Sequence, residues 1–261
     1  MPITQRSILV AQSETTRRLR DYVRRLLMPG LDLFTRRRVR LKQHWKSGSR
    51  QFLDAGSGNG WFSYLAYRSG AKVTAVSALS EEVEKARAFY NTGLKIPVDS
   101  LEFKTLNLYQ IESLEKRFDE IICYETLEHI KDDQRVCAAF FSMLNPGGVL
   151  HLCCPYAEHP RWRNETLDLE ETGYHVRAGY TLESYRSLLE PLGFQITDVE
   201  KVGGRFLVKA QTLLSRMRAR AGDLSSLPLA ILLFSSVWFD RGDPLCPYCL
   251  YVRAIKPNSS K

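Results

Sequence analysis

Three glycines at alternate positions follow a short apolar segment, in the run Phe52-Leu53-Asp54-Ala55-Gly56-Ser57-Gly58-Asn59-Gly60. Glycine lets the backbone turn sharply out of a strand and approach a bound ligand closely, because no Cβ stands in the way. Residues 61–67 then continue as a helix, and the N-terminus of that helix would face the ligand. The run therefore predicts a strand, a ligand-binding loop and a helix, in that order.

The spacing of the glycines separates this loop from the loops of dinucleotide-binding proteins. Those loops read G-x-G-x-x-G, whereas this chain reads D-x-G-x-G-x-G, so its third glycine falls at a different place. The pattern argues against a nicotinamide cofactor and favours another nucleoside-like one. An ordinary glycine-rich turn between a strand and a helix is the alternative.

Strand-like and helix-like segments alternate along the rest of the chain. After the first strand, further strands are expected at 71–76, 101–106, 118–123, 148–153, 194–199 and 250–255, and helices at 80–90 and 181–189. This alternation predicts an α/β fold with a Rossmann-like, doubly wound, mostly parallel sheet of seven strands. We expect a core of residues 48–202 plus 246–256, a basic helical N-terminal extension at 1–47 and a helical insertion at 203–245.

The glycine loop, this alternation and the turn Asn145-Pro146-Gly147-Gly148 resemble the class I S-adenosylmethionine-dependent methyltransferases over residues 45–202 and the last strand. The resemblance implies that S-adenosylmethionine binds beyond the carboxyl ends of the first four strands. The implied cofactor-binding residues are Asp54, Gly56, Ser57, Gly58, Asn59, Gly60, Ser77, Ala78, Asn107, Leu108 and Tyr124. Ser77 departs from the family, which has an acid there for the ribose hydroxyls, because serine makes only weaker, neutral hydrogen bonds.

A second motif, Glu125-Thr126-Leu127-Glu128-His129, follows the fourth predicted strand. In a helix that begins there, Glu125, Glu128 and His129 project from one face and supply most of a divalent metal site. The motif resembles that of the ubiquinone-biosynthesis O-methyltransferases and of the small-RNA 2′-O-methyltransferases. In those groups it binds, with a distant histidine, a metal that holds the acceptor hydroxyl. The resemblance implies a Mg²⁺ or Zn²⁺ site formed by Glu125, Glu128, His129 and His175.

The same motif also has an interpretation without a metal. In many related methyltransferases the glutamate caps the helix and the histidine packs or lines the acceptor pocket. His129 or His175 would then act as a general base toward a hydroxyl, since a pKa near neutrality suits that task. In both interpretations Glu128, His129 and His175 are the expected catalytic residues, and oxygen is the expected nucleophile.

The charge of the chain is unevenly distributed, with +10 in residues 1–50, −9 in 51–200 and +7 in 201–261. Basic flanks suit a phosphate-bearing or membrane surface, although such runs are commonly solvated helix faces. Inside the insertion, a basic stretch precedes an apolar segment at 227–239, which is shorter than the roughly 20 residues that span a bilayer. It can lie in a membrane interface, cover an apolar substrate, or pack on the sheet or a second subunit.

These observations favour methylation of a hydroxyl on a small-molecule, glycan or lipid-linked acceptor. The loop 156–180, with Arg161, Trp162, Arg163 and Arg177, suits an anionic or sugar-like group. RNA 2′-O-methylation and cofactor binding without catalysis are the alternatives, and nucleic acid is the less favoured partner because no RNA-binding module accompanies the motif. No signal peptide is apparent, so we expect a cytoplasmic protein, with membrane-surface contact through residues 205–239 as an addition.

Overall fold

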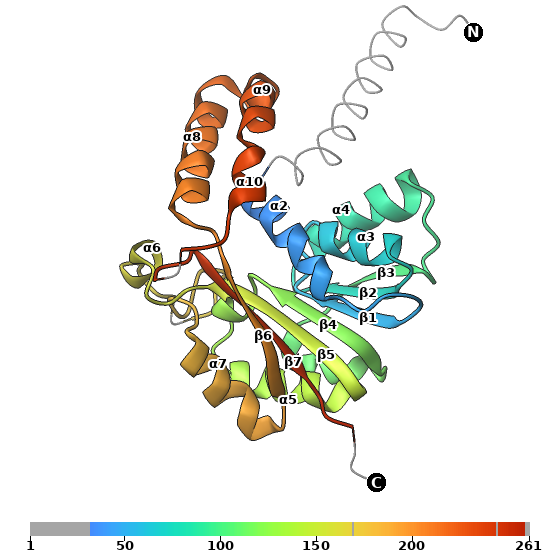
Figure 1. Cartoon of the computed structure of the whole chain (residues 1–261). Coiled ribbons are helices and arrows are strands. Elements are labelled where there is room, and N and C mark those ends of the chain that lie inside the picture. The colour runs from blue at the N-terminus through green and yellow to red at the C-terminus, as the bar shows by residue number, and fades with distance from the viewer. Residues whose placement is uncertain (1–31, 169, 244, 259–261) are drawn as a thin grey trace, which may run out of the picture.

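Seven apolar segments form the strands of a single twisted sheet in the computed structural model, which describes residues 32–168, 170–243 and 245–258 (Figure 1). The strands are β1 (Gln51–Ala55), β2 (Lys72–Ser77), β3 (Leu101–Thr105), β4 (Phe118–Tyr124), β5 (Leu144–Pro155), β6 (Gln195–Val202) and β7 (Cys249–Ile255). Their order is β3-β2-β1-β4-β5-β7-β6, and only β7 runs antiparallel to its neighbours. The predicted Rossmann-like, mostly parallel sheet is confirmed.

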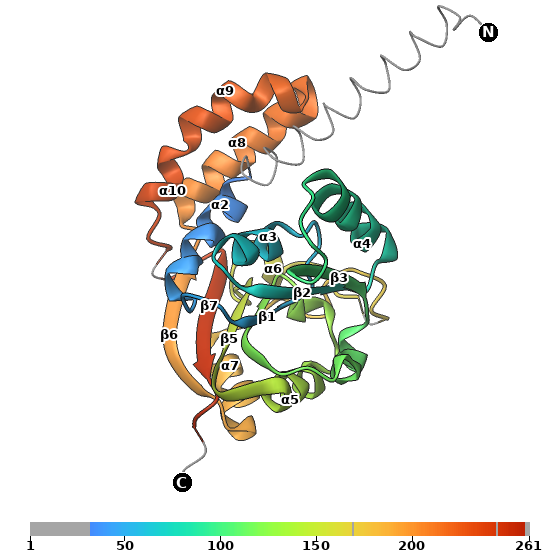
Figure 2. The same cartoon turned by 90° about the vertical axis from the view of Figure 1, so that its right-hand side faces the viewer.

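Helices cover both faces of the sheet. They are α2 (Leu33–Val39), α3 (Trp61–Arg68), α4 (Ser80–Ala86), α5 (Asp133–Met143), α6 (Pro160–Arg163), α7 (Leu182–Leu189), α8 (Arg205–Ala221), α9 (Asp223–Leu233) and α10 (Ser235–Phe239). Short 3₁₀ or π segments are η1 (Arg40–His44), η2 (Arg87–Gly93), η3 (Leu108–Leu114), η4 (Leu127–His129) and η5 (Glu190–Leu192). Helices α3 and α4 pack on one face and α5 and α7 on the other, so the central strands are buried on both sides and read as apolar runs (Figure 2).

The strand order reverses between β1 and β4. From β1 the chain builds outward through β2 to β3, then returns and lays β4 on the opposite side of β1. Connections to the two sides of this point diverge, which leaves a crevice beyond the carboxyl ends of the strands. The glycine loop after β1 and the Glu125–His129 motif after β4 therefore open onto the same crevice.

The predicted insertion between the last two strands is helical and consists of α8, α9 and α10. Helices α8 and α9 form a hairpin that projects beyond the sheet, and α2 lies between this hairpin and the core (Figure 1). Of the predicted N-terminal extension, residues 1–31 lie outside the described residues, and the remainder supplies α2 and η1. Within the described ranges, no helix combines the length and apolarity that crossing a bilayer requires.

A buried arginine joins α2, the end of the insertion and β6. The side chain of Arg37 is 1% exposed and contacts Asp240 through Nε at 2.7 Å and Glu200 through Nη2 at 2.5 Å. Asp240 also accepts hydrogen bonds from the backbone N–H groups of Gly203 and Gly204, where the insertion begins. These contacts close the insertion at its base and fix α2 against it.

We expect Arg37→Met to lower the free energy of unfolding by about 3–5 kcal/mol, because it leaves the buried Asp240 carboxylate without its cation. Urea denaturation measures this change. Arg186→Met is the matched control, since Arg186 forms only an exposed pair with Glu190, and such a pair is worth at most about 1 kcal/mol. Equal losses in the two variants would contradict the role given to Arg37.

Candidate functional site

The glycine loop is tied to the end of the neighbouring strand. The N–H groups of Gly56 and Ser57 both donate to the Val76 carbonyl of β2, at 2.9 and 2.8 Å. At Gly56 a Cβ would lie 2.2 Å from Thr126 Oγ1, so only glycine lets the loop pass the turn after β4. At Gly58, with φ +49°, a Cβ would meet no atom within 4 Å. Gly58 therefore borders open space at the mouth of the crevice.

Asp54 lies behind this loop. Its carboxylate is buried and accepts a 2.5 Å hydrogen bond from Ser63 Oγ in the first turn of α3. Burial raises the pKa of Asp54 to about 7, and the hydrogen bonds from Ser63 oppose that shift. The residue thus anchors α3 to β1, which holds the loop in place, and Asn59 Oδ1 assists by accepting from the Trp61 N–H at 3.0 Å.

A carboxylate that was not among the predicted cofactor-binding residues reaches the end of β2. Ser77 Oγ donates to Glu82 Oε2 at 2.7 Å, and Glu82 comes from the first turn of α4. Ala78 beside it is exposed. The sequence contained a signal for this contact. Glu82 lies in the acidic first turn of the predicted helix, only five residues after Ser77.

The predicted residues after β3 and at the end of β4 have side chains that already contact other parts of the protein. Asn107 caps η3, since its Oδ1 accepts from the Tyr109 N–H at 2.9 Å, and Leu108 is buried. The ring of Tyr124 packs edge-on against Phe62, and its hydroxyl accepts from Trp45 Nε1 at 3.2 Å. The Tyr124 side chain is therefore committed to the core.

These features fit a nucleoside cofactor. The crevice offers the open backbone at Gly58, the buried Ser57 Oγ, which has no hydrogen-bond partner within the described part of the chain, and the carboxylate of Glu82. In open parallel sheets, nucleotide riboses are commonly held by an acid about 20 residues after the glycine loop, and Glu82 satisfies that spacing.

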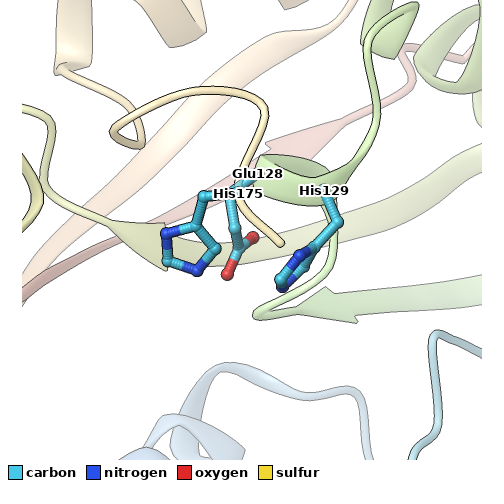
Figure 3. A group of neighbouring side chains, drawn as sticks. All are labelled: Glu128, His129 and His175. Carbon is cyan, nitrogen blue, oxygen red and sulfur yellow. The ribbon is translucent and has the colours of Figure 1, made fainter. Parts of the chain in front are cut away.

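Three of the four proposed metal-binding residues come together beside this crevice. The ligand atoms of Glu128, His129 and His175 all lie within 4.8 Å of one another. Figure 3 shows that Glu128 and His129 extend from one turn, η4, and that His175 comes from the separate loop before α7. That loop is fixed to η4, because the Val176 N–H donates to the Glu128 carbonyl at 2.8 Å.

The electrostatics of this group are unusual for a protein interior. Glu128 is 1% exposed, its Oε2 lacks a hydrogen-bond partner among the described residues, and burial raises its pKa well above the usual range. Burial and the neighbouring His175 lower the pKa of His129. His175 Nδ1 lies 2.7 Å from Glu165 Oε2, but their orientation does not form a hydrogen bond. A buried carboxylate with an open oxygen beside two imidazoles fits a divalent cation.

The prediction of a helix that begins at Glu125 is wrong. Glu125 also does not join the group of Glu128, His129 and His175. Its φ of +50° breaks the backbone after β4, and only the single 3₁₀ turn η4 follows. The Glu125 carboxylate instead pairs with Arg38 of α2 at 2.8 Å and accepts from Cys249 Sγ at 3.3 Å. Spacing along the chain could not reveal this, because Arg38 is distant in sequence.

Arg177, one of the residues expected to suit an anionic acceptor, has a structural role. Its guanidinium pairs with Asp133 at the start of α5 and donates to the Ile130 carbonyl at 2.6 Å. These contacts hold the loop 173–178 over η4. Arg161 lies elsewhere, stacked over the Trp162 ring at 4.8 Å.

Comparison with known proteins assigns the fold to a family. The methyltransferase domain family matches residues 12–199, which is most of the chain. The chain therefore belongs to this family, and its sheet is that of the class I S-adenosylmethionine-dependent methyltransferases.

Among curated proteins, the chain is 36% identical over 107 residues to the ubiquinone biosynthesis O-methyltransferase of Xanthomonas campestris pv. campestris, covering 38% of this chain and 41% of the relative. A Haemophilus ducreyi protein of the same name is 33% identical over 105 residues, or 40% of this chain and 44% of the relative. The matches thus span less than half the length of these relatives. A solved Haemonchus contortus phosphoethanolamine N-methyltransferase 2, in complex with S-adenosylhomocysteine, superimposes with a TM-score of 0.60 at 17% identity, covering 86% of this chain and 53% of that one.

We expect Gly58→Ala to weaken S-adenosylmethionine binding by about tenfold or more, because the new methyl group enters the space beside the loop. Calorimetric titration measures the affinity. Gly48→Ala is the matched control, since Gly48 also has a positive φ and no neighbour within 4 Å. Both variants carry a backbone cost of about 1–2 kcal/mol, so equal cofactor affinities would contradict the placement of Gly58.

A second expectation concerns Glu82. Glu82→Gln removes the charge that would strengthen hydrogen bonds from the ribose hydroxyls, so the same titration should show affinity lower by about tenfold to a hundredfold. Glu81→Gln is the control, because Glu81 is its exposed neighbour and pairs with Lys85 instead. If Glu81→Gln weakened binding as much, the effect would come from net charge and not from Glu82.

Proposed function

We propose that this protein transfers the methyl group of S-adenosylmethionine to a hydroxyl oxygen of a small-molecule, glycan or lipid-linked acceptor. The observation that carries the proposal is the juxtaposition of the glycine-loop crevice with Glu128, His129 and His175. Membership of the methyltransferase domain family supports the cofactor. The relatives named ubiquinone biosynthesis O-methyltransferase support oxygen as the methylated atom.

His129 would act on the acceptor hydroxyl through Nε2. Its Nδ1 lies 3.0 Å from the Tyr174 carbonyl, an acceptor only, which assigns the N–H to Nδ1 and the lone pair to Nε2. The lowered pKa keeps the ring neutral near pH 7 and able to accept a proton. The residues around the crevice otherwise align the hydroxyl with the methyl group, and such alignment is a major part of the rate gain in a displacement reaction.

The same three side chains would hold a divalent metal, Mg²⁺ or Zn²⁺, if one is used. Glu128 Oε2 is the open buried oxygen of the group. His129 Nδ1 faces the Tyr174 carbonyl, as the second ring nitrogen of a metal-bound histidine commonly faces a carbonyl or carboxylate. A bound cation would supply Lewis acidity that lowers the pKa of an acceptor hydroxyl. Glu128, His129 and His175 would then position the acceptor, and Glu128 would be ionised.

We propose that the insertion, α8 to α10, contacts a membrane surface. Exposed apolar side chains lie on all three of its helices, at Leu213 of α8, Ile231 and Leu232 of α9, and Trp238 and Phe239 of α10. Helix α8 is strongly basic. Large exposed apolar side chains next to basic ones suit an interface with anionic lipid.

We expect His129→Ala to lower turnover by about a hundredfold to ten-thousandfold with little change in S-adenosylmethionine affinity, because the residue acts on the acceptor. The release of S-adenosylhomocysteine with a panel of phenolic and alcoholic acceptors measures turnover, and calorimetry measures affinity. Exhaustive chelation of the wild-type protein should lower turnover to a similar level if a metal is used. Full activity after chelation would leave His129 as a general base, and full activity of His129→Ala would contradict both mechanisms.

A further inference from the structure

A cavity of about 350 Å³ extends along α8, from Val208 to Ala219, away from the glycine loop. Helix α8 forms one wall, and α2, α6 and the segment before β7 form the others. The residues that matter for its chemistry are Phe34, Arg161, Val208, Ser215, Arg216 and Tyr248. The volume falls in the range of about 300–1,000 Å³ that is common for small-ligand pockets.

Two positive charges border this cavity without a compensating carboxylate. Within the described part of the chain, neither guanidinium, of Arg161 or of Arg216, forms an ion pair or a hydrogen bond, and that of Arg161 lies over the rings of Trp162 and Tyr248 at 4.8 and 5.7 Å. The described residues that line the cavity include no acid. The nearby carboxylate of Asp32 is already used, because it accepts from the Thr35 N–H at 2.7 Å and from Gln211 Nε2 at 2.7 Å. The open guanidinium groups favour an anion, and phosphate in particular, which arginine binds with a two-pronged geometry.

The other side of the cavity is apolar. The rings of Phe34 and Tyr248 stack at 4.0 Å with an interplanar angle of 16°, and Val208 lies beside them on α8. The exposed Phe206 and Leu213 are on the same helix, outside the cavity. A ligand that fits both sides has an anionic head and an apolar portion.

The cavity is also connected to the candidate catalytic group through aromatic contacts. Tyr248 meets Trp162 at a centroid distance of 4.9 Å, Trp162 meets His175 at 5.3 Å, and His175 meets His129 at 4.8 Å. Trp162 Nε1 donates to the Tyr248 carbonyl at 3.1 Å, which fixes the order of the rings. A molecule held in the cavity is thus separated from the histidines by the two rings of Tyr248 and Trp162.

We propose that this cavity binds the phosphate group of an amphiphilic acceptor, with Arg161 and Arg216 on the phosphate and the Phe34–Tyr248 stack on the apolar portion. The inference rests on the proposed function, because it names the class of acceptor that the methyl transfer would serve. It places the phosphate beside α8, in the hairpin whose exposed apolar side chains suit a membrane surface. The hydroxyl to be methylated would extend past Trp162 toward His129.

Calorimetric titration of the 261-residue chain with a short-chain alkyl phosphate tests the inference, with inorganic phosphate and the corresponding alkyl alcohol as the two partial ligands. The alkyl phosphate should bind more tightly than either. Arg161→Gln and Arg216→Gln should each weaken its binding by about tenfold to a hundredfold, the loss expected for one charged hydrogen bond. Arg220→Gln is the control, since Arg220 is an exposed arginine of the same helix that does not line the cavity.

Vesicles distinguish a lipid head group from a free phosphate compound. Phosphatidylcholine vesicles containing phosphatidic acid should retain the wild-type protein better than they retain the two variants, and pure phosphatidylcholine vesicles should show no such difference. Equal affinity for inorganic phosphate and alkyl phosphate, or equal losses in Arg220→Gln, would overturn the inference. So would an unchanged affinity in both arginine variants.

Failure of this inference and failure of the proposed function give different results. Titration with S-adenosylmethionine should be the same in wild type, Arg161→Gln and Arg216→Gln, because both arginines lie away from the glycine loop. No cofactor binding by the wild-type protein would refute the proposed methyl transfer, whatever the alkyl phosphate does. Normal cofactor binding with no binding of alkyl phosphate would refute the cavity alone.

Discussion

The reversal of strand order between β1 and β4 is the constraint on which the candidate site depends. It forces the loops after these two strands to face each other across one crevice, and the contact between Gly56 and Thr126 shows how closely they approach. A side chain larger than hydrogen at Gly56 would push the turn after β4 away. The positions of Glu128 and His129 are therefore set by the backbone of the glycine loop as well as by their own turn.

Two of the buried charged side chains, Arg37 and Glu128, have different consequences for the structure. Arg37 lies among Asp240, Glu200 and backbone groups, and this pairing joins α2 to the base of the insertion. Glu128 is equally buried but has an oxygen without a partner among the described residues. Burial without pairing is costly for a carboxylate, and such groups are found where a proton, a cation or a substrate completes the site. The contrast separates a structural ion pair from a candidate functional group.

Helix α2 connects the parts of the molecule that the family core does not explain. Arg38 of this helix pairs with Glu125, which therefore does not join Glu128, His129 and His175. Arg37 pairs with Asp240 at the end of the insertion, and Phe34 lines the cavity beside α8. The aromatic contacts from Phe34 through Tyr248 and Trp162 lead from this region to His175. The additions to the core are thus linked to the candidate catalytic residues by a chain of buried aromatic contacts.

The sequence by itself determined the sheet, the glycine loop and the helical insertion, because these follow from local patterns of apolar residues and glycine. The resemblance to known methyltransferases implied a group of Glu125, Glu128, His129 and His175, and the structure brings together the last three of these residues. Only the tertiary structure decided the partners of three charged side chains. Glu125 pairs with Arg38, and Arg177 pairs with Asp133. Glu82 accepts a hydrogen bond from Ser77. The physical reason is that the partner of a charged side chain depends on which elements pack together, and sequence spacing carries no information about that packing.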